Sequence, residues 1–210
     1  MTIATMTTRA NMSRQRVTQH SKRLSWLLRH GAREVGLAMD PAGWVDIPAL
    51  LGHLRMNRAT LDEVVRTNDK NRIQIEGERV RACQGHSKDA GVRLDALEAS
   101  WAEFTGEDRI WHGTRGEVIP IVAREGLSPQ QRTHVHLAAG LHSKVGKRAQ
   151  VEIMLGVDPA RVRDAGVRIY EAPNGVILAR RIPAQAIVEL RGMTRRGRAR
   201  EAELRALLGL

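Results

Sequence analysis

Several short stretches of this chain place arginine, histidine and small residues where phosphate chemistry could use them. Arg29 and His30 are adjacent at the end of a predicted helix. An arginine beside a histidine can bind phosphate through both charge and hydrogen bonds. A helix C-terminus favours the same pair, because basic side chains interact with the last carbonyl groups and with the helix dipole. Position alone favours the helix end and leaves phosphate binding as the alternative.

A second candidate covers residues 81–87, with the sequence RACQGHS, after a predicted hairpin. Gly85, between Gln84 and His86, suits a tight turn that exposes donor groups to a phosphate. A polar interdomain linker has the same composition, and by itself that alternative is favoured. Cys83 has no evident partner for nucleophilic catalysis, so we expect it to be structural.

Two histidine motifs follow. His112 ends a predicted strand, and Gly113 beside it would let a ligand approach the backbone. Residues 112–114 match the HxT motif of two-histidine phosphoesterases. Those enzymes need two such motifs, and the sequence contains no second one. His134 and His136 share one face of a strand, because strand side chains alternate. No cysteine or acidic cluster nearby completes a zinc site, so a hydrogen-bonding role is favoured over metal binding.

Composition limits the class of protein that carries these residues. The 210 residues include 34 Lys+Arg and 23 Asp+Glu, so the formal charge is +11. This favours a nucleic-acid or nucleotide partner, with a merely basic surface as an equal alternative. Aromatic residues make up only 3%, which argues against base stacking on an aromatic sheet. Apolar runs are too short for a membrane span, no secretory signal is evident, and one cysteine fits a cytoplasmic protein.

Apolar patterning organises the first half of the chain. Residues 1–20 have no acidic side chain, and we expect them to form a flexible basic arm. Three helices are predicted to begin at Ser21, Asp46 and Thr60. The alternation around Ile73 and Val80 predicts a β-hairpin. These elements predict a winged-helix-like lobe with a linker over residues 21–95, an architecture common in nucleic-acid binding.

The second half alternates short strands and helices. Strands are predicted at residues 109–112, 134–137, 151–157, 167–170, 176–178 and 187–190. Helices are predicted over residues 117–125 and after Asp158. We therefore expect an α+β protein whose second lobe, residues 96–192, is built on a mixed, mostly antiparallel sheet. A basic C-terminal tail over residues 193–210 follows, either disordered or docked as a helix.

Together these stretches resemble the RNA 2′-phosphotransferase family, the NAD-dependent enzymes that remove the splice-junction 2′-phosphate from tRNA. The matching segments are residues 21–30 (SKRLSWLLRH), 43–45 (GWV), 70–72 (KNR), 81–87 (RACQGHS), 111–114 (WHGT), 132–137 (RTHVHL) and 174–178 (NGVIL). Each segment is weak by itself. Their shared order and spacing make the resemblance specific.

The resemblance implies an RNA-binding winged-helix lobe followed by an NAD-binding lobe of ADP-ribosyltransferase type. It implies a catalytic set of Arg29, His30, Arg72 and Arg132. It implies NAD⁺ contacts from His112, Gly113, Thr114, His136 and Val176, and looser RNA or phosphate contacts from Lys22, Arg81, Gln84, His86 and Ser87. The expected partners are NAD⁺ as co-substrate and a 2′-phosphorylated, tRNA-like RNA, with no metal ion, for a monomeric cytoplasmic protein.

The implied reaction has two steps: ADP-ribosylation of the RNA 2′-phosphate with release of nicotinamide, then transesterification to 2′-OH RNA and ADP-ribose 1″,2″-cyclic phosphate. Two alternatives stay open. One is an ADP-ribosyltransferase that modifies nucleic-acid phosphate ends and stops after the first step. The other is a non-enzymatic winged-helix protein that binds nucleic acid, although such a protein has no need of the four phosphate-directed catalytic residues.

Overall fold

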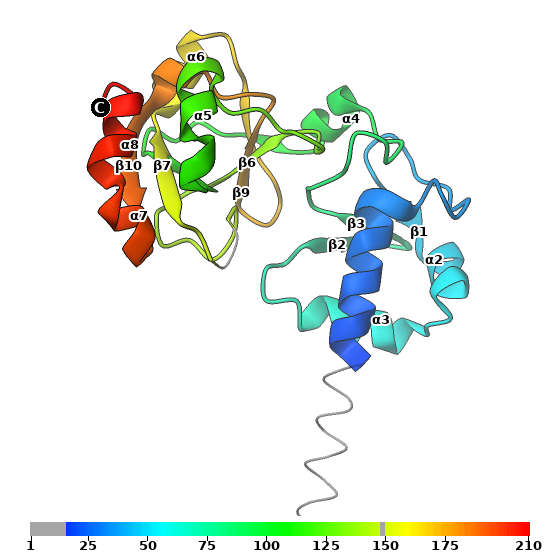
Figure 1. The fold of residues 1–210 in the computed structure, drawn as a ribbon. Helices are drawn as coiled ribbons and strands as arrows, with labels where there is room; N and C mark the ends of the chain where they lie inside the picture. The colour runs from blue at the N-terminus through cyan, green and yellow to red at the C-terminus, as the bar shows by residue number, and fades with distance from the viewer. Residues whose placement is uncertain (1–15, 148–149) are drawn as a thin grey trace, which may run out of the picture. The chain divides into compact units, whose positions relative to one another are not determined.

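A computed structural model describes residues 16–147 and 150–210 (Figure 1). The chain divides into two compact units, Met1–Leu97 and Glu98–Leu210. This division lies two residues beyond the domain boundary expected between residues 95 and 96. Most of the predicted basic arm, residues 1–15, falls outside the described residues.

The first unit begins with a long helix. Residues 16–26 are α-helical and continue directly into the π-helical turn η1 (Leu27–Gly31). The prediction of a flexible arm is therefore wrong for residues 16–20. The reason is that Val17 packs against the same apolar cluster as Leu24, so the buried stripe of the helix starts earlier than predicted.

Two further helices and a small sheet complete the first unit. The elements are β1 (Val45–Asp46), α2 (Ile47–Leu54), α3 (Arg58–Arg66), β2 (Ile73–Glu76) and β3 (Arg79–Ala82), and the antiparallel sheet has the order β1-β3-β2. The predicted hairpin is confirmed. The predicted cap of α3 is wrong, because the N-cap is Asn57, whose side chain accepts from the Thr60 amide at 2.9 Å. The winged-helix arrangement stays a prediction.

The second unit is built on a seven-stranded sheet of order β10-β7-β5-β6-β9-β8-β4. Its strands are β4 (Ala102–Glu103), β5 (Ile110–Thr114), β6 (Val135–Ala138), β7 (Ile153–Val157), β8 (Ile169–Glu171), β9 (Val176–Ala179) and β10 (Ile187–Gly192). Every neighbouring pair is antiparallel. The expected α+β class and the antiparallel pairing are therefore confirmed. The sheet is not mixed as expected, since none of its paired strands in the described residues is parallel. The ADP-ribosyltransferase arrangement stays a prediction.

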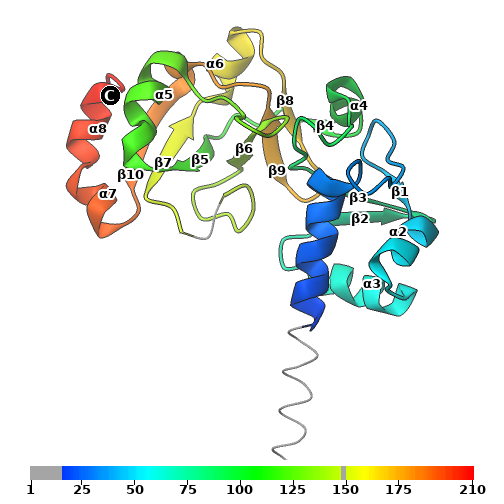
Figure 2. The ribbon, with the colours of Figure 1, turned by 45° about the vertical axis from the view of Figure 1, so that its right-hand side comes forward.

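Short helices surround this sheet: α4 (Leu94–Ala99), which crosses the division between the units, η2 (Gly116–Val118), α5 (Ile119–Glu125), α6 (Pro159–Asp164), η3 (Ala184–Ala186), α7 (Arg195–Ala199) and α8 (Glu201–Leu207). Helices α5, α7 and α8 lie beside the β7 and β10 end of the sheet (Figure 2). The predicted basic tail is thus folded and docked, since Leu204 of α8 is fully buried in the core. Within the described ranges, no helix combines the length and apolar character that crossing a bilayer requires.

Candidate functional site

A π-helical turn carries Arg29 and His30 in the first unit. Its closing backbone hydrogen bond spans five residues at 3.0 Å, rather than the four of an α-helix. Gly31 permits this geometry, because a Cβ there would collide with the Trp26 ring. Single π turns are rare and occur frequently at functional sites. Lys22, predicted to contact RNA, is exposed on the same helix, five residues before the start of the π turn at Leu27.

The predicted phosphate loop packs directly against Arg29. The backbone amide of Ser87 donates to the Arg29 carbonyl at 2.9 Å, and the Ser87 hydroxyl lies 3.3 Å from the same oxygen. Gly85 has a φ of +91°, and a Cβ there would lie 3.3 Å from Arg29 Nε. The first unit therefore brings together Arg29 and residues 84–87, which are more than fifty residues apart in sequence.

Arg72 lies at the same end of the β2–β3 hairpin. It precedes β2, and its carbonyl accepts from the Cys83 amide at 2.9 Å, directly before the 84–87 loop. Its Nη1 lies 3.7 Å from an Asp69 carboxylate oxygen. Arg29 is close enough to Cys83 for its charge to affect the pKa of that thiol. Two predicted catalytic arginines and the glycine loop therefore surround one hairpin end.

Cys83 is a buried thiol within this group. Its Sγ donates to the Asn71 carbonyl at 3.2 Å. Burial raises the pKa of Cys83 to about 11, although the charges of Arg81 and Arg29 act in the opposite direction. The side chain is therefore a protonated thiol at neutral pH, which fits its expected structural role.

Three side chains predicted to contact RNA are buried: Arg81, Gln84 and His86. Arg81 Nε donates to Gln74 Oε1 at 2.9 Å, and its guanidinium lies 4.5 Å from the centre of the Trp44 ring. His86 packs against Gly43, where a Cβ would approach the imidazole to 2.7 Å. These contacts support the hairpin and the 84–87 loop from inside. An RNA contact by these three residues stays a prediction.

In the second unit, strands β5 and β6 are neighbours in the sheet but are hardly paired with each other; we call this the parted region. These strands share one paired position, Trp111 with Ala138, whereas β5 pairs with β7 along its whole length. Between these strands, His112 Nδ1 bonds to the His136 carbonyl at 2.9 Å. Within the segment that forms β6, His136 Nδ1 bonds to the His134 carbonyl at 3.0 Å. A carbonyl only accepts, so both Nδ1 atoms carry protons. In the neutral rings, Nε2 is then a hydrogen-bond acceptor.

The other predicted NAD⁺ contacts surround this parted region. Gly113 follows His112 in β5, and a Cβ there would meet Val151 at 2.8 Å, so the position suits glycine. Thr114 ends β5, and Val176 begins β9, which pairs with β6. Arg132 lies in the turn before β6. Arg132 thus belongs to the second unit, whereas Arg29, His30 and Arg72 belong to the first.

Comparison with known proteins decides the family. A profile described as "RNA 2'-phosphotransferase, Tpt1 / KptA family" matches residues 15–181. This chain belongs to that RNA 2′-phosphotransferase family. The resemblance found in the sequence motifs is therefore confirmed, and β10, α7 and α8 lie beyond the matched residues.

Curated relatives agree with this membership, and each is named a probable RNA 2′-phosphotransferase. The one from Burkholderia lata is 36% identical over 182 residues, covering 82% of this chain and 91% of the relative. The one from Pseudomonas aeruginosa strain UCBPP-PA14 is 36% identical over 187 residues, covering 85% and 100%. The one from Streptomyces coelicolor is 35% identical over 181 residues, covering 83% and 96%. By family, then, the protein is a transferase with an RNA substrate.

This RNA 2′-phosphotransferase contains a buried polar cluster that sequence reasoning missed. Glu98 Oε1 bonds to His134 Nε2 at 3.0 Å and accepts from Arg180 Nε at 2.6 Å, and its Oε2 accepts from Arg180 Nη2 at 2.8 Å. The Trp101 ring meets the His134 ring edge-on, with 4.9 Å between centroids. The side chain of His134 is 0% exposed and that of Glu98 is 10% exposed. The HxH pattern indicated a hydrogen-bonding role for His134, but no local signal indicated Glu98.

Burial and hydrogen bonding set the charges of this cluster. Burial lowers the pKa of His134, although Glu98 acts in the opposite direction. Its Nδ1 is buried with no hydrogen-bond partner among the described residues, which fits a neutral ring that donates through Nε2. Burial alone would raise the pKa of Glu98, but the bonds from Arg180 and His134 outweigh it and lower that pKa.

The free energy of unfolding is expected to fall as the pH drops below about 6.5, the ordinary pKa of histidine. The unfolded chain takes up a proton on His134 there, whereas the folded chain resists it. Glu98 adds a second loss below about pH 4.5, since its pKa is also depressed in the folded state. Thermal melts between about pH 8 and pH 5 should show the first effect, and His134→Gln should reduce this slope. The same slope in His134→Gln, or an equal reduction in the control His142→Gln at an exposed position, would contradict the assignment.

Proposed function

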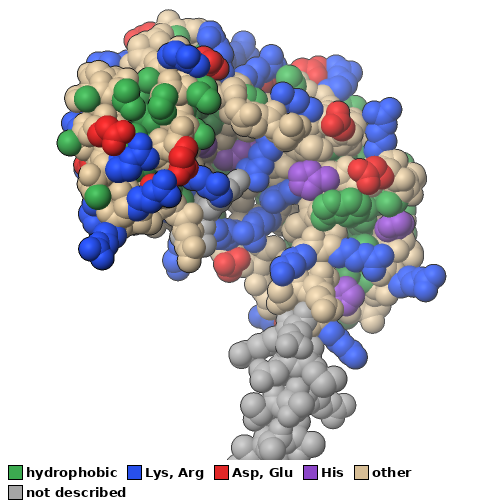
Figure 3. Space-filling view, viewed as in Figure 1, with side chains coloured by type: hydrophobic (Ala, Val, Ile, Leu, Met, Phe, Trp, Pro, Cys, Tyr) green, Lys and Arg blue, Asp and Glu red, His purple; other side chains and the backbone are tan. Residues whose placement is uncertain are grey.

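We propose that this protein transfers an internal RNA 2′-phosphate to NAD⁺ in two steps. The observation that carries the proposal is the group of Arg29, Arg72 and the 84–87 loop at one hairpin end, in a chain of the RNA 2′-phosphotransferase family. Guanidinium groups bind phosphate through paired hydrogen bonds, so this group suits a phosphate-bearing substrate. Lys and Arg side chains also lie on both units in the face seen in Figure 3, as a polyanionic substrate favours.

In the first proposed step, an oxygen of the RNA 2′-phosphate attacks the ribose carbon that bears nicotinamide. The bond from that carbon to nicotinamide breaks as the new carbon–oxygen bond forms. Phosphate is a sufficient nucleophile and nicotinamide a sufficient leaving group, so the protein mainly aligns the reactants and stabilises charge. We assign this alignment of the phosphate to Arg29 and Arg132.

In the second proposed step, the 2″-hydroxyl of the transferred ADP-ribose attacks phosphorus and gives up its proton, and the bond from phosphorus to the RNA 2′-oxygen breaks. The departing RNA oxygen must receive a proton, and we assign His30 to donate it or to bond the phosphate. Arg72 would neutralise the charge that grows on the phosphate oxygens, a role that metal ions fill in other phosphoryl transfers. The products are RNA with a 2′-hydroxyl and ADP-ribose 1″,2″-cyclic phosphate.

The parted region between β5 and β6 fits the NAD⁺ co-substrate. Because the His112 and His136 rings carry their protons on Nδ1, each can offer Nε2 as an acceptor. The hydroxyl groups of a ribose are donors, so they suit such acceptors. Gly113 next to His112 allows Val151 to pack closely against the strand, so its part in the site is in packing.

The direct test of this function is incubation of the protein with a short RNA that bears one internal 2′-phosphate, with and without NAD⁺, followed by mass spectrometry. Loss of the phosphate only with NAD⁺, together with ADP-ribose cyclic phosphate, is the expected result. RNA that gains ADP-ribose without further conversion would instead indicate an ADP-ribosyltransferase. Unchanged RNA under both conditions would contradict the proposal and favour a nucleic-acid-binding protein.

Gly85→Ala is expected to lower the rate of phosphate removal roughly tenfold to a hundredfold. The new methyl group would strain a backbone with a φ of +91° and press on Arg29 Nε at 3.3 Å. Gly91→Ala is the matched control, because Gly91 has a φ of +88° but no atom within 4 Å of the added Cβ. Steady-state rates of both variants decide the matter. Equal losses in the two would attribute the effect to backbone strain rather than to Arg29.

A further inference from the structure

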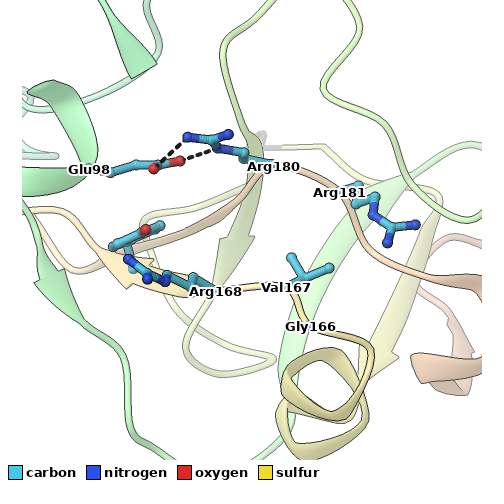
Figure 4. A pocket seen from close by; sticks show the side chains of 7 residues that line it. Glu98, Gly166, Val167, Arg168, Arg180 and Arg181 are labelled. Atoms are coloured by element: carbon cyan, nitrogen blue, oxygen red, sulfur yellow. Dashed lines mark hydrogen bonds and ion pairs between the residues drawn. The ribbon is translucent and has the colours of Figure 1, made fainter. Parts of the chain in front are cut away.

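A cavity of about 450 Å³ opens in the second unit, and none of its lining residues belongs to the motifs that carry the family resemblance. It is lined by Glu98, Gly166, Val167, Arg168, Tyr170, Arg180 and Arg181 (Figure 4). These residues come from α4, from the start of β8 and the loop before it, and from the segment that follows β9. The cavity therefore lies where the outer strands of the sheet meet α4.

The charge of the cavity wall is positive. Arg180 forms two hydrogen bonds with Glu98, so this pair contributes no net charge. Arg168 and Arg181 are both exposed, and neither forms an ion pair with any carboxylate of the described residues. In Figure 4 Arg180 points toward Glu98, while Arg168 and Arg181 point elsewhere around the cavity. Two uncompensated guanidinium groups favour an anionic ligand.

Buried contacts hold this wall in place. The side chain of Glu98 is nine-tenths buried and also bonds to His134 at 3.0 Å. Trp101 packs on His134 and lies 6.2 Å from the Tyr170 ring. Tyr170 in turn is hydrogen-bonded to Arg168. The part of the wall formed by Glu98 and Tyr170 is therefore fixed before a ligand arrives, which lowers the entropy cost of binding there.

The cavity shares a sheet face with the proposed NAD⁺ contacts. Leu178 of β9 is paired with His136 on one side and with Tyr170 on the other, so these three side chains point to the same face. Arg180 nevertheless follows Val176 by four residues, which is about 13 Å along an extended strand. A ligand held near Val176 reaches the arginines only if it is long.

We propose that this cavity binds a backbone phosphate of the RNA strand that flanks the reacting 2′-phosphate. The proposal rests on the proposed function, which supplies RNA as the ligand. An RNA strand continues beyond its reacting nucleotide and carries a phosphate at every step. Arg168 and Arg181 would supply the donors to the phosphate, and the Arg180–Glu98 pair forms another part of the same wall. Since phosphate contacts read no sequence, the site adds affinity without base preference.

The test compares direct RNA binding by wild type and the double variant Arg168→Ala/Arg181→Ala. Fluorescence anisotropy without NAD⁺ would give the Kd of a 2′-phosphorylated RNA of about twelve nucleotides and of a 2′-phosphorylated trinucleotide, across a range of salt concentrations. The control is Arg124→Ala/Arg195→Ala, which removes the same charge from exposed positions of the same unit.

We expect the double variant to raise the Kd of the longer RNA about tenfold and to change that of the trinucleotide less than about twofold. The slope of log K against log salt should become shallower by about 0.7, because the variant loses one phosphate contact on a single strand. Arg168→Lys/Arg181→Lys should keep most of this slope, since the charges remain. Thermal melts would establish that each variant is folded.

Three results would overturn the inference: equal weakening for both RNA lengths, an effect of the same size in the control variant, or weaker NAD⁺ binding with unchanged RNA binding. The last result would assign the cavity to the diphosphate of NAD⁺. Because binding is measured without turnover, a wild-type protein that fails to remove the 2′-phosphate refutes the proposed function separately and leaves this comparison decisive.

Discussion

Arg29→Ala is expected to lower the rate of RNA 2′-phosphate removal about a thousandfold, the largest effect of any single change considered. Arg29 lies in the η1 turn, its carbonyl accepts from Ser87, and its guanidinium lies against Gly85. The contacts with Ser87 and Gly85 therefore position the guanidinium group of Arg29. Loss of a positioned charged donor removes stabilisation that is greatest in the transition state.

Two matched variants sharpen this test. Arg29→Lys keeps the charge but loses the planar fork, so it should recover only a small part of the rate. Arg33→Ala removes an exposed arginine four residues later and should leave the rate within about twofold. Single-turnover rates and thermal melts of all three variants form the measurement. A folded Arg29→Ala protein with more than about a tenth of the wild-type rate would refute the role of Arg29.

Arg72→Ala is expected to slow the second chemical step about a hundredfold while NAD⁺ binding changes little. Arg72 is proposed to stabilise charge on the phosphate oxygens during transesterification, when that charge is greatest. The backbone of Arg72 should stay in place, because its carbonyl accepts from the Cys83 amide whatever the side chain. RNA that carries ADP-ribose should therefore accumulate in this variant.

The measurement is a single-turnover time course, followed by separation of 2′-phosphate RNA, ADP-ribosylated RNA and 2′-hydroxyl RNA. Arg66→Ala is the control, since Arg66 is an exposed arginine of the same unit that is paired with Glu63. The control should show no accumulation of the intermediate. An unchanged second-step rate in Arg72→Ala, or an equal slowing of both steps, would remove Arg72 from that role.

Local sequence signals predicted most of the secondary structure. Pro48 near the start of α2, Gly126 after α5 and the turn at 173–175 before β9 act on their nearest neighbours, so their effect can be derived without the fold. Where prediction failed, the cause was packing. Residues 16–20 are helical because Val17 reaches the core. For the basic C-terminal residues, the sequence left disorder and a docked helix open, and the burial of Leu204 decides for the helix.

The candidate site divides in the same way. The types and order of the motif residues, with Arg29-His30, Arg72 and Arg132 among them, were enough to identify the family from the sequence alone. Their geometry was not predictable. The π turn at Leu27–Gly31 depends on how Trp26 packs over a glycine, which a helical pattern does not encode.

By itself, then, the sequence determined the family, the order of helices and strands, and the residue types available for phosphate chemistry. The tertiary structure alone decided which of them meet. Glu98 bonds to His134 and Arg180, which are 36 and 82 residues away. The pairing of β6 with β5 and β9 places a backbone carbonyl beside Nδ1 of His112 and of His136, and this contact fixes a proton on each Nδ1 atom. Contacts between residues so far apart in the chain form only when strands pair, because no local preference of the backbone specifies them.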